Sequence, residues 1–280
     1  MLEIEKEEEQ KRTVKKLMFD DDNVIKPSSY VGFDSIQQQF VSKIIQKGFS
    51  FNIMVVGLTG IGKSTFINSL FNIEFPDHSL KSHALETVQI NDNYYIVQEG
   101  DVKLRLGIIE TQGFGDQINK EKSNEAIIDH IDKQFIKYFN QELKIDKHQD
   151  DLSNDTRVHV CIYLISPNGR GLAPIDLITM KQLQSKVNII PILAKVDSLT
   201  KHELSILKQN ISNDIKNNNI NVYDFDTNDN DEVQQPFGIV SSNEFNEKNI
   251  RSRKYCWGTI EIDNKNHNDF RDFRENFFNK

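Results

Sequence analysis

The feature that most constrains this chain is a glycine-rich segment at residues 57–65, with the sequence GLTGIGKST. It fits the pattern Gly-x4-Gly-Lys-Ser/Thr, in which glycines let backbone N–H groups curl around phosphate oxygens at a helix N-terminus. An apolar run at residues 51–56 precedes it and a helical run at residues 63–71 follows. A strand before and a helix after distinguish a phosphate-binding loop from a chance glycine-rich turn. The sequence therefore predicts such a loop, with Lys63 reaching the outer phosphates and the Ser64 hydroxyl on Mg²⁺.

Strand and helix signals alternate along the rest of the chain. Further strands are predicted at residues 102–109, 158–165, 187–193 and 237–240, and helices at residues 123–143, from about 175, and at 199–216. Short apolar strands are typical of a parallel sheet buried on both faces. The alternation predicts an α/β fold, a doubly wound and mostly parallel sheet with right-handed crossovers and helices on both faces. The charge-rich residues 1–29 are predicted to form an arm ahead of a domain at residues 30–280.

A lysine and an aspartate follow directly after the predicted strand at residues 187–193. Parallel sheets bind ligands at the carboxyl ends of their strands, so these side chains are placed for recognition. The Asp197 carboxylate can accept two hydrogen bonds from the N1 and N2 edge of guanine, a pattern that adenine lacks. Lys195 would lie along the ring. Guanine nucleotide is therefore the predicted ligand.

A third segment, residues 108–113 with the sequence IIETQG, ends the predicted strand at 102–109. Glu110 is placed for an acidic residue near the Mg²⁺ shell, and Gly113 for a backbone N–H that senses the γ-phosphate. The position of this segment at the end of a strand fits a nucleotide switch well. Its residue types fit that role less well.

The composition disfavours several other classes of protein. The chain has 42 acidic and 34 basic residues, a net charge of -8, which disfavours nucleic-acid binding because that binding depends on basic surface. No run approaches the roughly 18 apolar residues of a membrane span, and the N-terminus does not resemble a signal peptide, so a cytoplasmic location is expected. Cys161 and Cys256 lie far apart in apolar sequence and are predicted to be reduced packing residues.

Together these residues resemble the septins, a family of filament-forming GTP-binding proteins, from residue 30 to the C-terminus. The resemblance extends beyond the GTPase motifs to YVGF at 30–33, RVH at 157–159, NIIP at 188–191 and WGTIEIDN at 257–264. The last segment looks like the start of the septin unique element, with which the family builds subunit interfaces. Residues 255–280 would form part of that element, and the chain stops inside a helix that the family continues. Trp257 alone could equally be a core aromatic.

The resemblance implies a set of nucleotide-binding residues in the phosphate loop, the switch, the base-reading loop and two later positions. They are Gly57, Leu58, Thr59, Gly60, Ile61, Gly62, Lys63, Ser64, Thr65, Gly113, Lys195, Val196, Asp197, Ser198, Leu199, Thr200, Lys201, His202, Glu203, Ser241 and Arg253. Ser241 falls where the family usually has a glycine near guanine, and Arg253 matches an arginine that packs on the base. Thr87 matches a catalytic switch threonine that would share the metal with Ser64. An ordinary strand threonine is the alternative.

Three departures from the family pattern bear on catalysis and assembly. Residues 110–113 read Glu-Thr-Gln-Gly where the family has Asp-Thr-Pro-Gly, so the acid is one methylene longer and the proline restraint is gone. Phe114 stands where faster GTPases place a glutamine that orients the attacking water, so hydrolysis is predicted to be slow. Arg170 replaces a histidine that the family often directs at a neighbouring subunit's nucleotide.

The resemblance implies a subunit that binds GTP or GDP with Mg²⁺ and assembles with other septin subunits into hetero-oligomers or filaments. Such assemblies scaffold the cell cortex and the division site. A monomeric GTPase switch and a non-hydrolysing pseudo-GTPase are the alternatives. Lys11, Arg12, Lys15 and Lys16 sit where septins carry a membrane-directed basic stretch, but neighbouring acidic residues dilute its field, so binding to an anionic membrane stays open.

Overall fold

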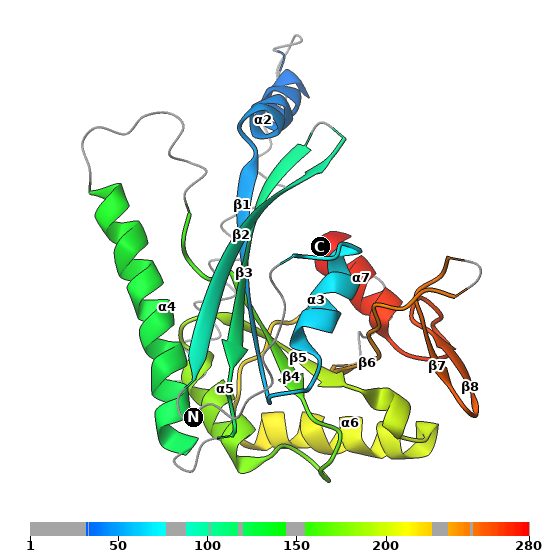
Figure 1. Ribbon diagram of the computed structural model, residues 1–280. Coiled ribbons are helices and arrows are strands. Elements are labelled where there is room, and N and C mark those ends of the chain that lie inside the picture. Colours follow the sequence, from blue (N-terminus) through cyan, green and yellow to red (C-terminus); the bar gives the residue numbers. More distant parts are fainter. Residues whose placement is uncertain are drawn as a thin grey trace, which may run out of the picture. The chain divides into compact units, whose positions relative to one another are not determined.

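The computed structural model of the protein describes residues 32, 34–76, 88–100, 102–116, 120–143, 155–225, 235–246 and 249–279 (Figure 1). The chain divides into two compact units, Met1–Gln46 and Lys47–Lys280. Helix α2 (Asp34–Lys47) belongs to the first except for its last residue. The predicted arm and its basic stretch at 11–16 lie outside the described residues, and the domain boundary at residue 30 stays a prediction.

A six-stranded sheet in the order β2-β3-β1-β4-β5-β6 forms the centre of the second unit. Its strands are β1 (Phe49–Gly57), β2 (Gln89–Glu99), β3 (Val102–Gln112), β4 (Val160–Ile165), β5 (Asn188–Ala194) and β6 (Phe237–Ile239). All neighbours pair in parallel except β2 with β3, which form an antiparallel pair at the edge, visible as the two long strands in Figure 1. The mostly parallel sheet predicted from the sequence is confirmed.

Helices cover both faces of this sheet, as predicted. They are α3 (Lys63–Phe71), α4 (Lys120–Glu142), α5 (Pro174–Leu183), α6 (Lys201–Asn217) and α7 (Phe270–Asn279). Successive side chains of a strand point to opposite faces, so Met54 and Val56 join a core with α4, α5 and α6. Ile53 and Val55 join a second core with α3 and α7. Among the described residues, no helix combines the length and apolar character that crossing a bilayer requires.

A two-stranded antiparallel sheet, β7 (Ser252–Tyr255) with β8 (Gly258–Glu261), follows the main sheet in sequence. Trp257 in its turn is 65% exposed, so the reading of this residue as a core aromatic is wrong. Cys256 is also exposed, and its prediction as a packing residue is wrong because a tight turn directs its side chain to solvent. Cys161 in β4 is buried as predicted, and burial raises the pKa of its thiol to about 12.

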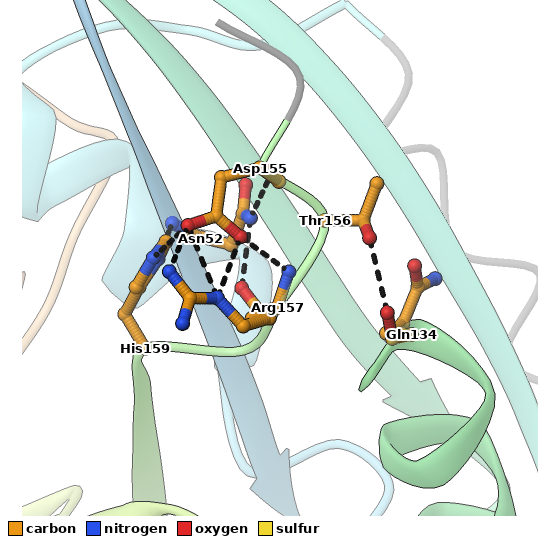
Figure 2. A network of polar contacts seen from close by, with 6 residues as sticks. All are labelled: Asn52, Gln134, Asp155, Thr156, Arg157 and His159. Carbon is orange, nitrogen blue, oxygen red and sulfur yellow. Dashed lines mark hydrogen bonds and ion pairs between the residues drawn. The ribbon is translucent and has the colours of Figure 1, made fainter. Parts of the chain in front are cut away.

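A network of hydrogen bonds joins residues 155–159, just before β4, to strand β1 (Figure 2). The buried Asn52 amide donates to the carbonyl oxygens of Asp155 and Arg157, both at 2.8 Å. The backbone N–H of Asn52 donates to His159 Nδ1 at 2.9 Å, and the His159 N–H returns a bond to the Asn52 carbonyl at 3.0 Å. Arg157 Nη2 lies 2.6 Å from the Asp155 carboxylate. These bonds fix where the central strand β4 begins.

The Asp155 carboxylate is the charged centre of this network. Partial burial opposes its charged form, but hydrogen bonds from the Arg157 side chain and backbone, with the charges of His159 and Arg157, outweigh that effect. The pKa of Asp155 therefore lies below its ordinary value of 3.8.

Replacing Asp155 by asparagine should lower the free energy of unfolding by about 1–2 kcal/mol near neutral pH, because charge-assisted bonds at a partly exposed site are lost. Since folding lowers this pKa, the carboxylate stabilises the protein above pH 3.8 and loses that effect as pH falls through the folded value. The difference between wild type and Asp155→Asn should be constant at neutral pH and shrink in acid. Urea unfolding at a series of pH values, followed by circular dichroism, measures it. A difference unchanged below pH 3.8 would contradict this role.

Candidate functional site

The predicted phosphate loop joins β1 to α3 at the carboxyl edge of the sheet, in the strand–loop–helix context that the sequence indicated. Gly60 and Gly62 have φ angles of 74° and 106°, which glycine adopts without a steric penalty. Helix α3 begins at Lys63 with Gly62 as its N-cap, and no side chain of the described ranges caps it. The N–H groups of its first turn are therefore available to an anion.

Lys63 is 4% exposed, and its Nζ donates to the carbonyl oxygens of Gly57 at 2.9 Å and Leu58 at 3.0 Å. Burial lowers the pKa of this ammonium from 10.5 to about 8, although the charges of Glu110 and Asp116 act in the opposite direction. Among the described residues, no carboxylate forms an ion pair with it. A buried cation held by neutral carbonyls is suited to pair with a bound polyanion.

Two oxygen-bearing side chains meet beside Lys63. Ser64 Oγ donates to Glu110 Oε2 at 3.2 Å, and both residues are buried. The register of β1 with β3 places Glu110 opposite Val55, so the acid stands near the loop despite 46 residues of separation. Hard oxygen ligands, few from protein and the rest from phosphates, suit Mg²⁺. The oxygens of Ser64 and Glu110 fit this ion and would hold it. A bound Mg²⁺ would offset the negative charge of the phosphates.

The switch segment turns sharply after β3. Gly113 is buried with a φ of 73°, and the carbonyl of Phe114 accepts from the Thr59 N–H at 3.3 Å, which ties the switch to the phosphate loop. The Phe114 side chain is fully buried and packs edge-on against Tyr163, with ring centroids 6.4 Å apart. It therefore faces the core and cannot position water. Thr87 lies outside the described residues, so its predicted role stays a prediction.

The predicted base-reading loop follows β5. Lys195 has a φ of 55°, and its Nζ donates to the Gly60 carbonyl at 2.7 Å, which joins this loop to the phosphate loop. The Asp197 side chain is 7% exposed. Its Oδ2 accepts from the Tyr255 hydroxyl and lies 3.5 Å from Arg253 Nη1, while its buried Oδ1 has no hydrogen-bond partner among the described residues.

A cavity of about 420 Å³ separates the phosphate and base-reading loops. It is lined by Leu58, Thr59, Gly60, Ile61, Ser166, Pro167, Asn168, Lys195, Asp197, Ser198 and Arg253. The sequence predicted eight of these and missed the three that follow strand β4. Their position at the carboxyl end of a parallel strand was the signal that could have found them.

Other predicted site residues lie beside this cavity or away from it. Ser241 lies beside the predicted phosphate loop, with its Oγ 4.0 Å from where a Cβ on Gly62 would stand, but it does not line the cavity. Val196 is buried in the core. Thr200 caps helix α6 in a reciprocal bond with Glu203, and Lys201 and His202 are exposed in its first turn. None of the residues 199–203 lines the cavity. Arg170 is exposed, and its carbonyl accepts from Asn210.

Comparisons with known proteins agree with this geometry. The model of the Septin family matches residues 47–280. Septin-2 of Drosophila melanogaster is 43% identical over 262 residues, 90% of this chain and 62% of that protein. Septin-8 of Mus musculus is 46% identical over 257 residues, 88% of this chain and 59% of that protein. The crystal structure of a septin GTPase domain from Chlamydomonas reinhardtii has a TM-score of 0.63 at 26% identity, covering 81% of this chain and 90% of that chain.

These matches differ in what they cover. The chain spans about three fifths of the length of the curated relatives, 62% of one and 59% of the other. Within this chain, however, the match to the family is nearly complete for the unit that holds the sheet and the cavity. The chain therefore belongs to the septin family and has the fold of a septin GTPase domain.

Proposed function

We propose that this protein is a septin subunit that binds guanine nucleotide, GTP or GDP, with Mg²⁺. The observation that carries the proposal is the buried Asp197 Oδ1, which finds no hydrogen-bond partner in the part of the chain that the structure describes. Asp197 lines the cavity beside the phosphate loop. A buried acceptor without a partner costs about 1–3 kcal/mol. One of the two donors of guanine, N1–H or the 2-amino group, would satisfy Oδ1 while the other reaches Oδ2, whereas adenine offers no matching pair of donors.

Arg253 supports the same assignment. Its side chain lines the cavity next to Asp197, and its guanidinium is partly exposed. A guanidinium plane stacks well on an aromatic ring, so Arg253 would pack on the base while Asp197 reads the edge of that base.

We infer that hydrolysis is slow. Lys63, Ser64 and Glu110 lie close together, where they could bind phosphate and a metal ion. The Phe114 ring, in contrast, is buried in the core. The chain thus offers at this position no polar side chain to orient an attacking water. The second candidate function is a monomeric GTPase switch, which the presence of Lys63, Ser64 and Thr87 in the sequence favours.

The proposed role is assembly with other septin subunits into oligomers or filaments at the cell cortex and division site. The exposed Trp257, on the hairpin that also carries Arg253 into the cavity, supports an interface next to the nucleotide. Bound nucleotide would then act largely as a structural ligand and stabilise the fold, by about 2.7 kcal/mol at a hundredfold excess over its dissociation constant.

Nucleotide content and oligomer size, measured on the same preparation, test this function. We expect purified protein to carry GDP or GTP, to elute as an oligomer, and to hydrolyse GTP slowly in a single turnover. Fast turnover by a monomer would instead identify a switch. Recovery of GTP alone would identify a non-hydrolysing pseudo-GTPase. Absence of guanine nucleotide, with no binding of added GDP, would refute the proposal altogether.

A further inference from the structure

Three side chains of the β7–β8 hairpin form a continuous stack. The rings of Tyr255 and Trp257 are nearly parallel, 6° apart, with centroids separated by 4.7 Å. The Arg253 guanidinium lies 5.5 Å from the centroid of the Tyr255 ring. Arg253 and Tyr255 are two residues apart on β7 and therefore share a face, and both contact Asp197 in the predicted base-reading loop. Tyr255 is the middle member of the stack.

The Tyr255 hydroxyl is also a hydrogen-bond partner of the Asp197 carboxylate. It donates to Asp197 Oδ2, the oxygen that Arg253 Nη1 approaches at 3.5 Å. The terminal torsion of an aspartate is broad, so a carboxylate turns easily unless a donor fixes one of its oxygens. The Tyr255 hydroxyl is such a donor, and Asp197 Oδ1 keeps its acceptor capacity.

We propose that Tyr255 is a positioning residue for base recognition. Its hydroxyl fixes the plane of the Asp197 carboxylate so that both oxygens face the N1–H and 2-amino group of a guanine. A carboxylate oxygen accepts more than one hydrogen bond, so Tyr255 and the base share Oδ2. Discrimination in favour of the 2-amino group thus depends on a residue that need not touch the ligand. This inference rests on the proposed function.

Hypoxanthine is the matched probe, because it keeps N1–H and lacks the 2-amino group. The preference of the protein for GDP over IDP therefore measures the second hydrogen bond to Asp197. Tyr255→Phe removes the hydroxyl and keeps the stacked ring. We expect it to weaken GDP about tenfold and IDP only about twofold, so the preference falls about fivefold. Competition against a fluorescent GDP analogue measures both affinities on the full chain.

Trp257 supplies a control for the fold of the hairpin. It is the only tryptophan in the chain, so its fluorescence reports directly on the stack. Tyr255→Phe should leave its emission spectrum unchanged. Trp257→Leu removes the stacking partner and spares the hydroxyl, and it should leave the GDP preference intact. An equal loss of preference in Trp257→Leu would overturn the proposal, because the hairpin as a whole would then be responsible.

A third variant distinguishes failure of the Tyr255 inference from failure of the proposed guanine-binding function. Asp197→Asn should abolish the preference for GDP over IDP. If it does not, the proposed base-reading role of Asp197 fails. If it does, and folded Tyr255→Phe keeps the wild-type preference, only the positioning role of Tyr255 is refuted. Thermal unfolding checks that each variant is folded, and Tyr255→Met carries the same test should Tyr255→Phe fail to fold.

Discussion

Replacing Lys63 by methionine should reduce the affinity for GDP and GTP at least a hundredfold, on the order of 3 kcal/mol or more, because a buried charge-assisted contact to phosphate is lost. The ammonium is desolvated in the free protein, and among the described residues it donates hydrogen bonds to the neutral carbonyl oxygens of Gly57 and Leu58. Most of its electrostatic energy is therefore gained when an anion binds. Isothermal titration with GDP and Mg²⁺ measures the loss.

A second buried lysine provides a matched control for this variant. Lys208 on α6 is buried and pairs with Asp269, away from the cavity lining. Lys208→Met should lower the free energy of unfolding and leave GDP affinity unchanged. Lys63→Met should instead raise the free energy of unfolding and lower the affinity for GDP. A buried charge with no carboxylate partner among the described residues destabilises the fold when no nucleotide is bound. Retention of GDP affinity by Lys63→Met would remove the phosphate loop from the proposed site.

Replacing Asp197 by asparagine should reverse the base preference from guanine to xanthine. An amide presents one acceptor and one donor, so it matches the N1–H and 2-carbonyl of xanthine and leaves the 2-amino group of guanine facing a donor. We expect the affinity for GDP to fall by at least about a hundredfold and xanthosine diphosphate to become the tighter ligand.

Direct competition between the two diphosphates tests this reversal. Asp132→Asn is the control, because it removes a carboxylate from α4 that pairs with Lys186 and does not line the cavity. That variant should keep the guanine preference. An Asp197→Asn protein that still prefers guanine would show that another group reads the base.

Several elements could be predicted because their signal is local. The phosphate loop, its flanking strand and its helix are specified by contiguous residues, and the structure places β1 and α3 around the predicted loop. The parallel strands are short apolar runs buried on both faces, a pattern visible without knowing their neighbours. Lys195 and Asp197 were found for the same reason, since they directly follow such a run.

Strand β2 was missed because its signal is weak. Its side chains are mostly half-buried or exposed, and polar residues occupy several of its positions. Pairing with β3 along its whole length stabilises it, and that pairing is a property of the hairpin rather than of the segment. Cys256 and Trp257 were misjudged for a related reason. Apolar residues in a tight turn suggest a core in the sequence, but the turn exposes them to solvent.

The sequence alone determined the glycine-rich loop, the alternation of strands and helices, and the positions of Lys195 and Asp197 after a strand, because each depends on neighbours along the chain. The tertiary structure decided what surrounds them. It brought Glu110 into contact with Ser64, 46 residues away, and Tyr255 into contact with Asp197, 58 residues away. It also buried the Phe114 side chain in the core. Contacts between distant segments follow from strand register and packing, which no local pattern of residues specifies.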